Sequence, residues 1–245
     1  KSSIRFDETF VGSGFEDNDW CNQLKNKCLI DNTVKVVHKN EAKNQSGEIW
    51  EKNKKYYELK WSDTFKFVAI YKTLLGSERL ESSLNSIYDF VDKIIVVHSV
   101  NLWGQTFSHE NNCIDVVNVW KRNCDIDNKI EVVVGLYPTQ SEQYAVGCNI
   151  AKRLFTDKLV YGLIIDTDEI WDAVNLQKLK GRIMQHPEYS SYHSKMYTYI
   201  KSPFYRVHPQ ESGKPTVAIN MKTIDMEKLS LYGPRFMSLI PALYM

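Results

Sequence analysis

The chain alternates between short, almost continuously apolar runs and longer stretches in which apolar residues recur every three or four positions. The apolar runs, rich in Val and Ile, are expected to be buried strands and span 65–72, 93–99, 129–135 and 159–166. The periodic stretches are expected to be helices and span 77–91, 113–124 and 141–158. Buried strands separated by helices are typical of a mostly parallel sheet that is covered on both faces. The pattern therefore predicts an α/β fold.

Two helical stretches carry a clear apolar face. In the first of them Ser77 is expected to cap the helix. Its inward residues are expected to be Leu80, Leu84, Ile87 and Val91. The inward residues of 141–158 are expected to be Ala145, Cys148, Ala151 and either Leu154 or Phe155. These faces would pack against the predicted sheet.

The flanking regions have weaker patterns. Residues 41–64 are polar and charged, but their aromatic residues recur at spacings that fit one stripe of a helix. These residues are Trp50, Tyr57 and Trp61. Residues 192–209 and 215–222 alternate more between apolar and polar positions, which predicts antiparallel or mixed strands.

Composition narrows the classes of function. The chain has 245 residues and a formal net charge of +1, with no strongly basic part, so nucleic-acid binding is not indicated. Its five cysteines form no CxxC pair, which is typical of free thiols in a reducing compartment. No apolar run has the length of a transmembrane helix, and we expect a cytoplasmic protein. Because the chain starts with Lys and ends in apolar residues, we also expect a fragment with a sheet incomplete at the C-terminus.

The stretch "YGLIIDTDEIWD" places acidic residues directly after a buried strand. In open α/β sheets, ligands bind beyond the carboxyl ends of the strands. Asp166 and Asp168, two positions apart, have the oxygen ligands that Mg²⁺ and Mn²⁺ accept beside phosphate oxygens. The alternative is a polar loop in which Asp168 or Asp172 caps the next helix.

Residues 65–172 resemble the nucleotide-binding half of a family 2-type glycosyltransferase with the GT-A fold. The matching stretches are "FVAIYKTLLGSERLESSLNSIYDFVDKIIVVHS", "EQYAVGCNIAKRL" and "LIIDTDEIWD". The resemblance implies a GT-A-like sheet, with Asp166 and Asp168 binding the metal and the donor diphosphate. The other donor-binding residues that it implies are Tyr71, Lys72 and Glu78. The chain departs from the family after the second strand, where it has "HSVNLWGQT" in place of acids.

The N-terminal part resembles the closing segment of the same kind of domain. The stretch "FDETFVGSGFEDND" matches a motif in which the second acid of a Glu-Asp pair, here Glu16 and Asp17, is the general base. The stretch "KVVHKNEAKNQS" matches a strand that ends in a metal-binding His, here His38. The alternative for the acids is the first turn of a helix that begins near Asp17.

These resemblances together predict two incomplete glycosyltransferase domains in tandem. Residues 1–60 would be the C-terminal piece of the first with a connecting helix, and residues 65–245 the nucleotide-binding and partial acceptor region of the second. A single circularly permuted domain is the alternative arrangement.

The implied activity is the metal-dependent transfer of a sugar, with inversion, from a nucleotide-sugar donor to a glycan or other hydroxyl acceptor. The expected cofactor is Mn²⁺ or Mg²⁺. Two other functions stay open at this point: a nucleotidyltransferase that acts on a sugar phosphate, and a non-catalytic carbohydrate-binding module. Pyrophosphate release would identify the former, and sugar binding that a chelator does not affect would identify the latter.

Overall fold

The computed structural model describes residues 6–10, 14–24, 47–101, 103, 113–195, 197–198, 208 and 215–225, and the backbone of 242–244. The chain divides into two compact units. Unit 1 contains residues 1–63 and 178–186, and unit 2 contains residues 64–177 and 187–245. The predicted tandem of domains 1–60 and 65–245 stays a prediction, because a division into units does not identify the domains.

Unit 2 is built on a mixed, mostly parallel sheet with the strand order β3-β2-β1-β4-β6-β5-β7. Its strands are β1 (Phe65–Thr73), β2 (Lys93–Ser99), β3 (Ile130–Gly135), β4 (Leu159–Asp166), β5 (Ser191–His193), β6 (Thr216–Asn220) and β7 (Ala242–Tyr244). The first four strands are parallel to one another. Strand β6 is antiparallel to β4 and to β5, and β5 is parallel to β7. The predicted α/β fold with a mostly parallel sheet is therefore confirmed.

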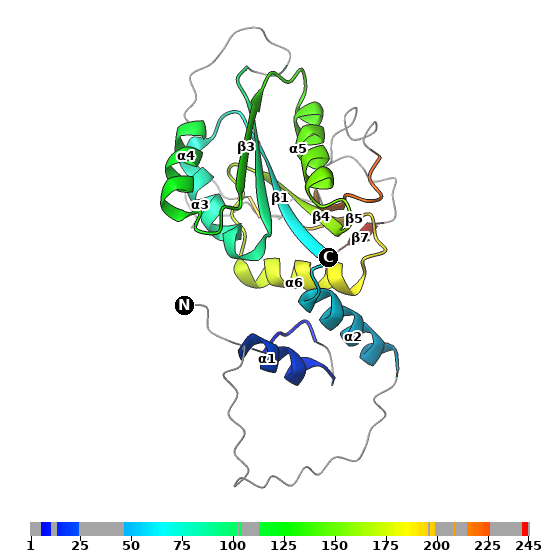
Figure 1. Cartoon of the computed structure of the whole chain (residues 1–245). Helices are drawn as coiled ribbons and strands as arrows, with labels where there is room; N and C mark the ends of the chain where they lie inside the picture. The colour runs from blue at the N-terminus through cyan, green and yellow to red at the C-terminus, as the bar shows by residue number, and fades with distance from the viewer. Residues whose placement is uncertain are drawn as a thin grey trace. The chain divides into compact units, whose positions relative to one another are not determined.

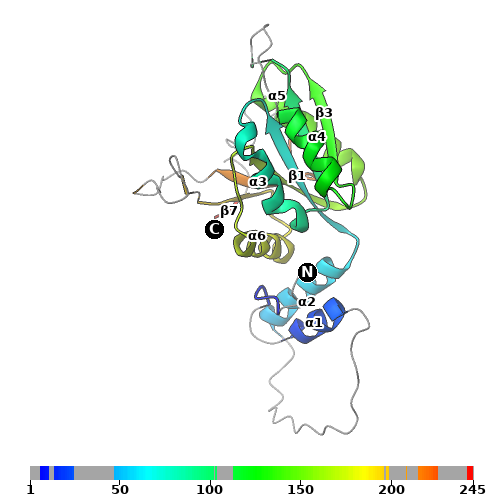
Figure 2. The same ribbon diagram turned by 90° about the vertical axis from the view of Figure 1, so that its left-hand side faces the viewer.

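Helices cover both faces of this sheet. The helices are α3 (Ser77–Ile87) with the short 3-10 helix η1 (Tyr88–Phe90), α4 (Cys113–Cys124), α5 (Gln140–Leu154) and α6 (Ala173–Gln185). Helices α3 and α4 lie on one face and α5 on the other, as the two perpendicular views show (Figure 1, Figure 2). Helix α6 has residues in both units.

Burial explains why the sequence pattern located these elements. Five consecutive residues of β1, 67–71, are fully buried, as expected for a strand with helices on both sides. The predicted inward face of α3 is also buried. Ser77 differs from the prediction: it is the first residue of α3, preceded by Gly76 in the left-handed region with φ +89°, and no side chain caps the helix.

Helix α5 packs unusually close to the sheet. A Cβ atom on Gly147 would lie 2.5 Å from Cγ2 of Ile70 and 3.1 Å from Cγ2 of Val97. The glycine therefore lets the helix backbone approach β1 and β2 directly. At the start of the helix, Thr139 accepts a hydrogen bond from the amide of Glu142 at 3.2 Å, which fixes the first turn.

Unit 1 contains α1 (Glu16–Leu24) and α2 (Glu48–Trp61), and α2 lies within the predicted helical stretch. Phe15 packs on Trp50 and Tyr57, so the aromatic stripe of α2 faces the segment around α1. The buried Asp7 and Asp19 both pair with Lys60 of α2, at 2.6 and 2.7 Å. Burial raises the pKa of Asp7, but hydrogen bonds from Lys60 and Tyr56 outweigh it, so the pKa lies below its ordinary value.

Within the ranges that the structure describes, no helix combines the length and the apolar composition needed to cross a bilayer.

Candidate functional site

The carboxyl ends of β1 and β4 place a lysine beside a carboxylate. The parallel register pairs Lys72 with Asp166, and Nζ of Lys72 lies 2.9 Å from Oδ1 of Asp166. Neighbouring side chains of a strand point to opposite faces, so Tyr71 points away from this pair. Its hydroxyl lies 2.8 Å from the hydroxyl of Ser83 in α3, and burial raises its pKa above the ordinary value. Tyr71, which was predicted to bind the donor, thus has its side chain on the opposite face of the sheet from Lys72 and Asp166.

The first turn of α5 surrounds the ammonium group of Lys72. Oε1 of Gln140 accepts a hydrogen bond from it at 2.9 Å. The ring of Tyr144 lies 5.4 Å from Nζ, and its hydroxyl donates to Oδ1 of Asp166 at 2.8 Å. The indole of Trp103 lies 5.2 Å from the same nitrogen. Two oxygen atoms and two aromatic rings therefore stabilise the cation and fix its position.

A buried glutamine connects this arrangement to the sheet. The side chain of Gln143 is fully buried. Its Nε2 donates to the carbonyl oxygens of Thr73 at 2.9 Å and Val97 at 2.6 Å, at or near the ends of β1 and β2. Its Oε1 accepts the indole N–H of Trp103 at 2.8 Å. A buried amide is stable only when it is hydrogen-bonded, so Gln143 holds the strand ends and Trp103 in one geometry.

The loop between β1 and α3 lies close to the turn after β4. The hydroxyl of Thr167 donates to the carbonyl oxygen of Leu75 at 3.1 Å. A Cβ atom on Gly76 would lie 2.6 Å from Oγ1 of Thr167, and its φ of +89° also favours glycine. The close approach brings the amino end of α3 to the carboxyl end of β4.

Two hydrogen bonds between Asp166 and Glu169 close the acidic turn after β4. The amide of Glu169 donates to the carbonyl oxygen of Asp166 at 3.1 Å, and Oε2 of Glu169 accepts from the amide of Asp166 at 3.2 Å. Asp172 accepts from the amide of Asn175 at 3.0 Å at the start of α6. The capping alternative is therefore correct for Asp172, and Asp168 lies exposed in the turn.

These elements enclose a cavity of about 590 Å³ at the carboxyl ends of β1 and β4. It is lined by Lys72, Leu74, Leu75, Gly76, Glu78, Arg79, Trp103, Asp166, Thr167 and Asp168. Four of the residues predicted to bind the donor line it, namely Lys72, Glu78, Asp166 and Asp168. The cavity thus lies where open α/β sheets bind their ligands.

The acids of the cavity could hold a metal ion only together with ligand oxygens. No group of three or more His, Cys, Asp or Glu residues that could hold a metal occurs within the described ranges. Mg²⁺ commonly uses one or two carboxylates and completes its shell with water and phosphate oxygens. Asp166 and Asp168 fit that kind of site. The predicted third ligand, His38, lies outside the described residues.

The predicted catalytic acids belong to unit 1. Glu16 is the first residue of α1, and its Oε2 accepts from the amide of Gly14 at 2.6 Å. Asp17 is exposed and accepts from the amide of Asn18 at 2.8 Å. Both acids stand in the first turn of a helix, as the alternative interpretation expected. The catalytic assignment of Glu16 and Asp17 stays a prediction.

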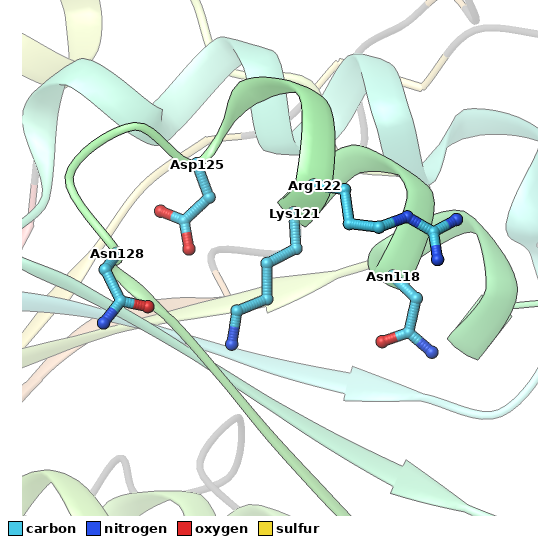
Figure 3. Close-up of a pocket in the computed structure, with 5 residues that line it drawn as sticks. All are labelled: Asn118, Lys121, Arg122, Asp125 and Asn128. Carbon is cyan, nitrogen blue, oxygen red and sulfur yellow. The ribbon is translucent and has the colours of Figure 1, made fainter.

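A second cavity, of about 480 Å³, lies at the other ends of the parallel strands (Figure 3). Its residues come from α4 and from the loop that leads into β3: Asn118, Lys121, Arg122, Asp125 and Asn128. Lys121 donates to the carbonyl oxygen of Ile130 at 2.9 Å, and Asp125 accepts from the amides of Lys129 and Ile130. These hydrogen bonds hold the loop between α4 and β3, so Lys121 and Asp125 have a structural role there.

Sequence reasoning missed Trp103 and the residues that α5 contributes. Gln140, Gln143 and Tyr144 follow one another at helical spacing in the first turn of α5. A search for apolar faces passes over the two glutamines because they are polar. The topology could have identified them. A helix that follows a parallel strand begins at the carboxyl edge of the sheet, where polar residues are expected to face the ligand.

Comparisons with known proteins give similarity only at the level of solved structures. No family model matches the chain, and no curated protein matches it. One similar structure is a 4-diphosphocytidyl-2C-methyl-D-erythritol synthase, with 13% identity, a TM-score of 0.45, and coverage of 74% of this chain and 87% of that chain. Another is Rv0371c from Mycobacterium tuberculosis H37Rv, with 10% identity, a TM-score of 0.45, and coverage of 75% and 89%. A structure of Rv0371c in complex with manganese matches with 10% identity, a TM-score of 0.41, and coverage of 74% and 88%.

These findings correct the family assignment made from the sequence. The resemblance to a family 2-type glycosyltransferase is wrong: the similar structures include a synthase of a diphosphocytidyl compound. The predicted sugar transfer from a nucleotide-sugar is wrong with it, as is the glycosyltransferase interpretation of the Asp-x-Asp motif. The error has a physical cause. A short acidic motif after a buried strand indicates a ligand site at the end of that strand, but sites at this position catalyse many different reactions.

Proposed function

We propose that unit 2 is the catalytic part of a nucleotidyltransferase. It transfers a nucleotidyl group from a nucleoside triphosphate to a sugar phosphate and releases pyrophosphate. The observation that carries the proposal is the pair of Lys72 and Asp166, held at 2.9 Å within a cavity at the carboxyl ends of parallel strands. This was the first alternative that the sequence left open, and the name of the similar synthase agrees with it.

The cavity offers several positive groups to a triphosphate. Lys72 supplies an ammonium group on a side chain that is only 13% exposed, and Arg79 supplies a guanidinium group. Helix α3 begins beside the cavity directly after Gly76, so its first backbone N–H groups add the positive end of a helix. Such groups bind phosphate oxygens and neutralise the charge that moves to the leaving pyrophosphate.

Asp166 and Asp168 are the residues that would hold Mg²⁺ or Mn²⁺ together with oxygens of the triphosphate. When bound, a divalent cation bridges phosphate oxygens and stabilises the leaving group. Tyr144 and the turn at Glu169 keep the carboxylate of Asp166 in place.

The chemistry of the acceptor also fits the residues. An oxygen of the sugar phosphate attacks the α-phosphorus, the bond from that phosphorus to the bridging oxygen of the β-phosphate breaks, and pyrophosphate leaves with the electron pair. A phosphate monoester has a second pKa of about 6, so its oxygen is already an anion at neutral pH. The reaction therefore needs no general base, and among the described residues the cavity wall contains no histidine.

The test is a pyrophosphate-release assay on the full chain, with each nucleoside triphosphate, a panel of sugar phosphates, and Mg²⁺ or Mn²⁺. We expect pyrophosphate and a nucleotide-sugar in equal amounts, and loss of both with a chelator. Lys72→Ala and Asp166→Asn should each lower kcat/KM by about 100-fold or more, because each removes a group that acts on the charge of the transition state.

Lys121→Ala is the matched control, because Lys121 lines the polar cavity at the opposite ends of the strands. It should keep wild-type turnover. The proposal is overturned if the wild-type protein binds no nucleoside triphosphate, or if Lys72→Ala turns over at the wild-type rate. Sugar binding that a chelator leaves unchanged, without pyrophosphate release, would favour a carbohydrate-binding module instead.

A further inference from the structure

Trp103 stands beside the cationic end of the cavity. Its indole lines the cavity together with Lys72, Leu74 and Arg79. The ring centre lies 5.2 Å from Nζ of Lys72, so an aromatic surface adjoins the group proposed to bind phosphate. A ligand that complements this wall has an anionic part and a flat aromatic part.

The orientation of Trp103 is set by buried groups. Its N–H donates to Oε1 of Gln143 at 2.8 Å. Gln143 is fully buried and is held in turn by the carbonyl oxygens of Thr73 and Val97. Because these bonds fix the amide, they also restrict the orientation of the indole before any ligand arrives. A ring held in this way loses little further freedom on binding.

We propose that Trp103 is the surface on which the base of the nucleotide stacks, with Gln143 as the residue that positions it. The inference rests on the proposed function, since it assigns a part of the same substrate to the same cavity. Stacking uses the face of the base, which every base has. The indole N–H already donates to Gln143, so Trp103 contributes no hydrogen bond to the edge of the base.

This assignment has a definite consequence for selectivity. Trp103→Ala should weaken the binding of purine and pyrimidine nucleoside triphosphates by similar factors. The expected loss is about 5- to 150-fold in Kd, the range found for one base on one aromatic side chain. Trp103→Phe keeps a ring and should recover most of the affinity.

The experiment is calorimetric titration of the full chain and its variants in the presence of Mg²⁺, with nucleoside triphosphates and, separately, inorganic tripolyphosphate. Trp103→Ala should weaken the nucleotides much more than tripolyphosphate, because that probe has no base and Asp166, Gln140 and Tyr144 still hold Lys72. Lys72→Ala should weaken both probes, because it removes the phosphate contact. Thermal unfolding of each variant checks that the partly exposed Trp103 can be replaced without loss of the fold.

The outcomes separate this inference from the proposed function. If nucleotides bind equally well to wild type and Trp103→Ala, or if Trp103→Ala weakens tripolyphosphate as much as nucleotides, the stacking assignment is overturned and nucleotidyl transfer stands. If nucleotides depend on Trp103 but no pyrophosphate is released, the stacking assignment stands and the reaction is wrong. If no nucleotide binds to the wild-type protein, both are overturned.

Discussion

Two lysines of this chain have similar partners and different roles. Lys60 in unit 1 contacts Asp7 and Asp19, and the rings of Phe10, Tyr56 and Trp61 lie within 6.0 Å of its ammonium group. Lys72 in unit 2 contacts one carboxylate and two rings and lines a cavity. Lys60 balances buried acids and so stabilises the fold, whereas Lys72 stands where a ligand can reach it.

Replacing Lys60 should destabilise unit 1 strongly. Lys60→Met leaves two carboxylates, Asp7 and Asp19, buried without their cation; their side chains are 3% and 0% exposed. Breaking a buried ion pair from one side costs about 3–5 kcal/mol. The measurement is native-state hydrogen exchange of residues 14–24 and 47–61 over a series of urea concentrations.

The matched control for this prediction is Lys52→Met on the same helix. Lys52 pairs with Glu48 at 2.6 Å, but the two side chains are 42% and 82% exposed. An exposed pair of this kind contributes less than about 1 kcal/mol. Equal exchange rates in the two variants would show that the buried acids of unit 1 do not depend on Lys60.

At the scale of elements, the sequence predicted the α/β alternation and named four of the ten residues that line the cavity. The strands β2 and β4 begin and end where the apolar runs do, and α4 agrees with its periodic stretch. Lys72 and Asp166 could be predicted because each ends an apolar run, and parallel strands end at the same edge. The contribution of α5 could not be read from periodicity, because Gln143 is a polar residue that is buried to make hydrogen bonds.

Helix α5 should tolerate little change where it meets the sheet. Gly147→Ala places a methyl group 2.5 Å from Cγ2 of Ile70, so the helix must move away from β1. We expect a loss of about 1–3 kcal/mol in the free energy of unfolding, the usual cost of overpacking. Because the first turn of α5 holds Lys72 and Asp166, nucleotide affinity should fall as well. Urea denaturation and calorimetric titration measure the two effects.

Asn149→Ala is the control for Gly147→Ala, since Asn149 lies on the exposed side of α5. Alanine favours the helix more than asparagine does, so stability should be unchanged or slightly higher. A Gly147→Ala protein that is as stable as Asn149→Ala would contradict the close packing of α5 on the sheet.

At the scale of the whole molecule, the candidate site lies at the ends of two inner strands of the sheet of unit 2. Strands β1 and β4 lie side by side, with parallel and antiparallel neighbours further out. Strand β3 is an edge strand of this sheet and is buried at only one of its six residues. The sequence located the strands, but it did not determine the order of the C-terminal ones, because short strands of three to five residues leave little pattern to pair.

Amide hydrogen exchange should reflect the difference between the inner strand β1 and the edge strand β3. Amides in the middle of β1 should exchange at least about tenfold more slowly than those of β3, a difference of about 1.4 kcal/mol in opening free energy. The measurement is exchange followed by mass spectrometry of peptides from 65–73 and 130–135. Equal protection of the two strands would mean that the edge of the sheet is covered by something other than the described residues.

The pairing of Lys72 with Asp166 also determines how the resting site is electrically balanced. Each of the two groups is the counter-ion of the other. An anion that takes the ammonium group for itself releases a negative charge that is only 26% exposed and cannot rely on water alone. The binding free energy of such an anion therefore depends on whether a second cation pairs with the carboxylate of Asp166. An anion is therefore expected to enter this cavity together with a cation, and an anion alone should bind less tightly than its contacts with Lys72 would imply.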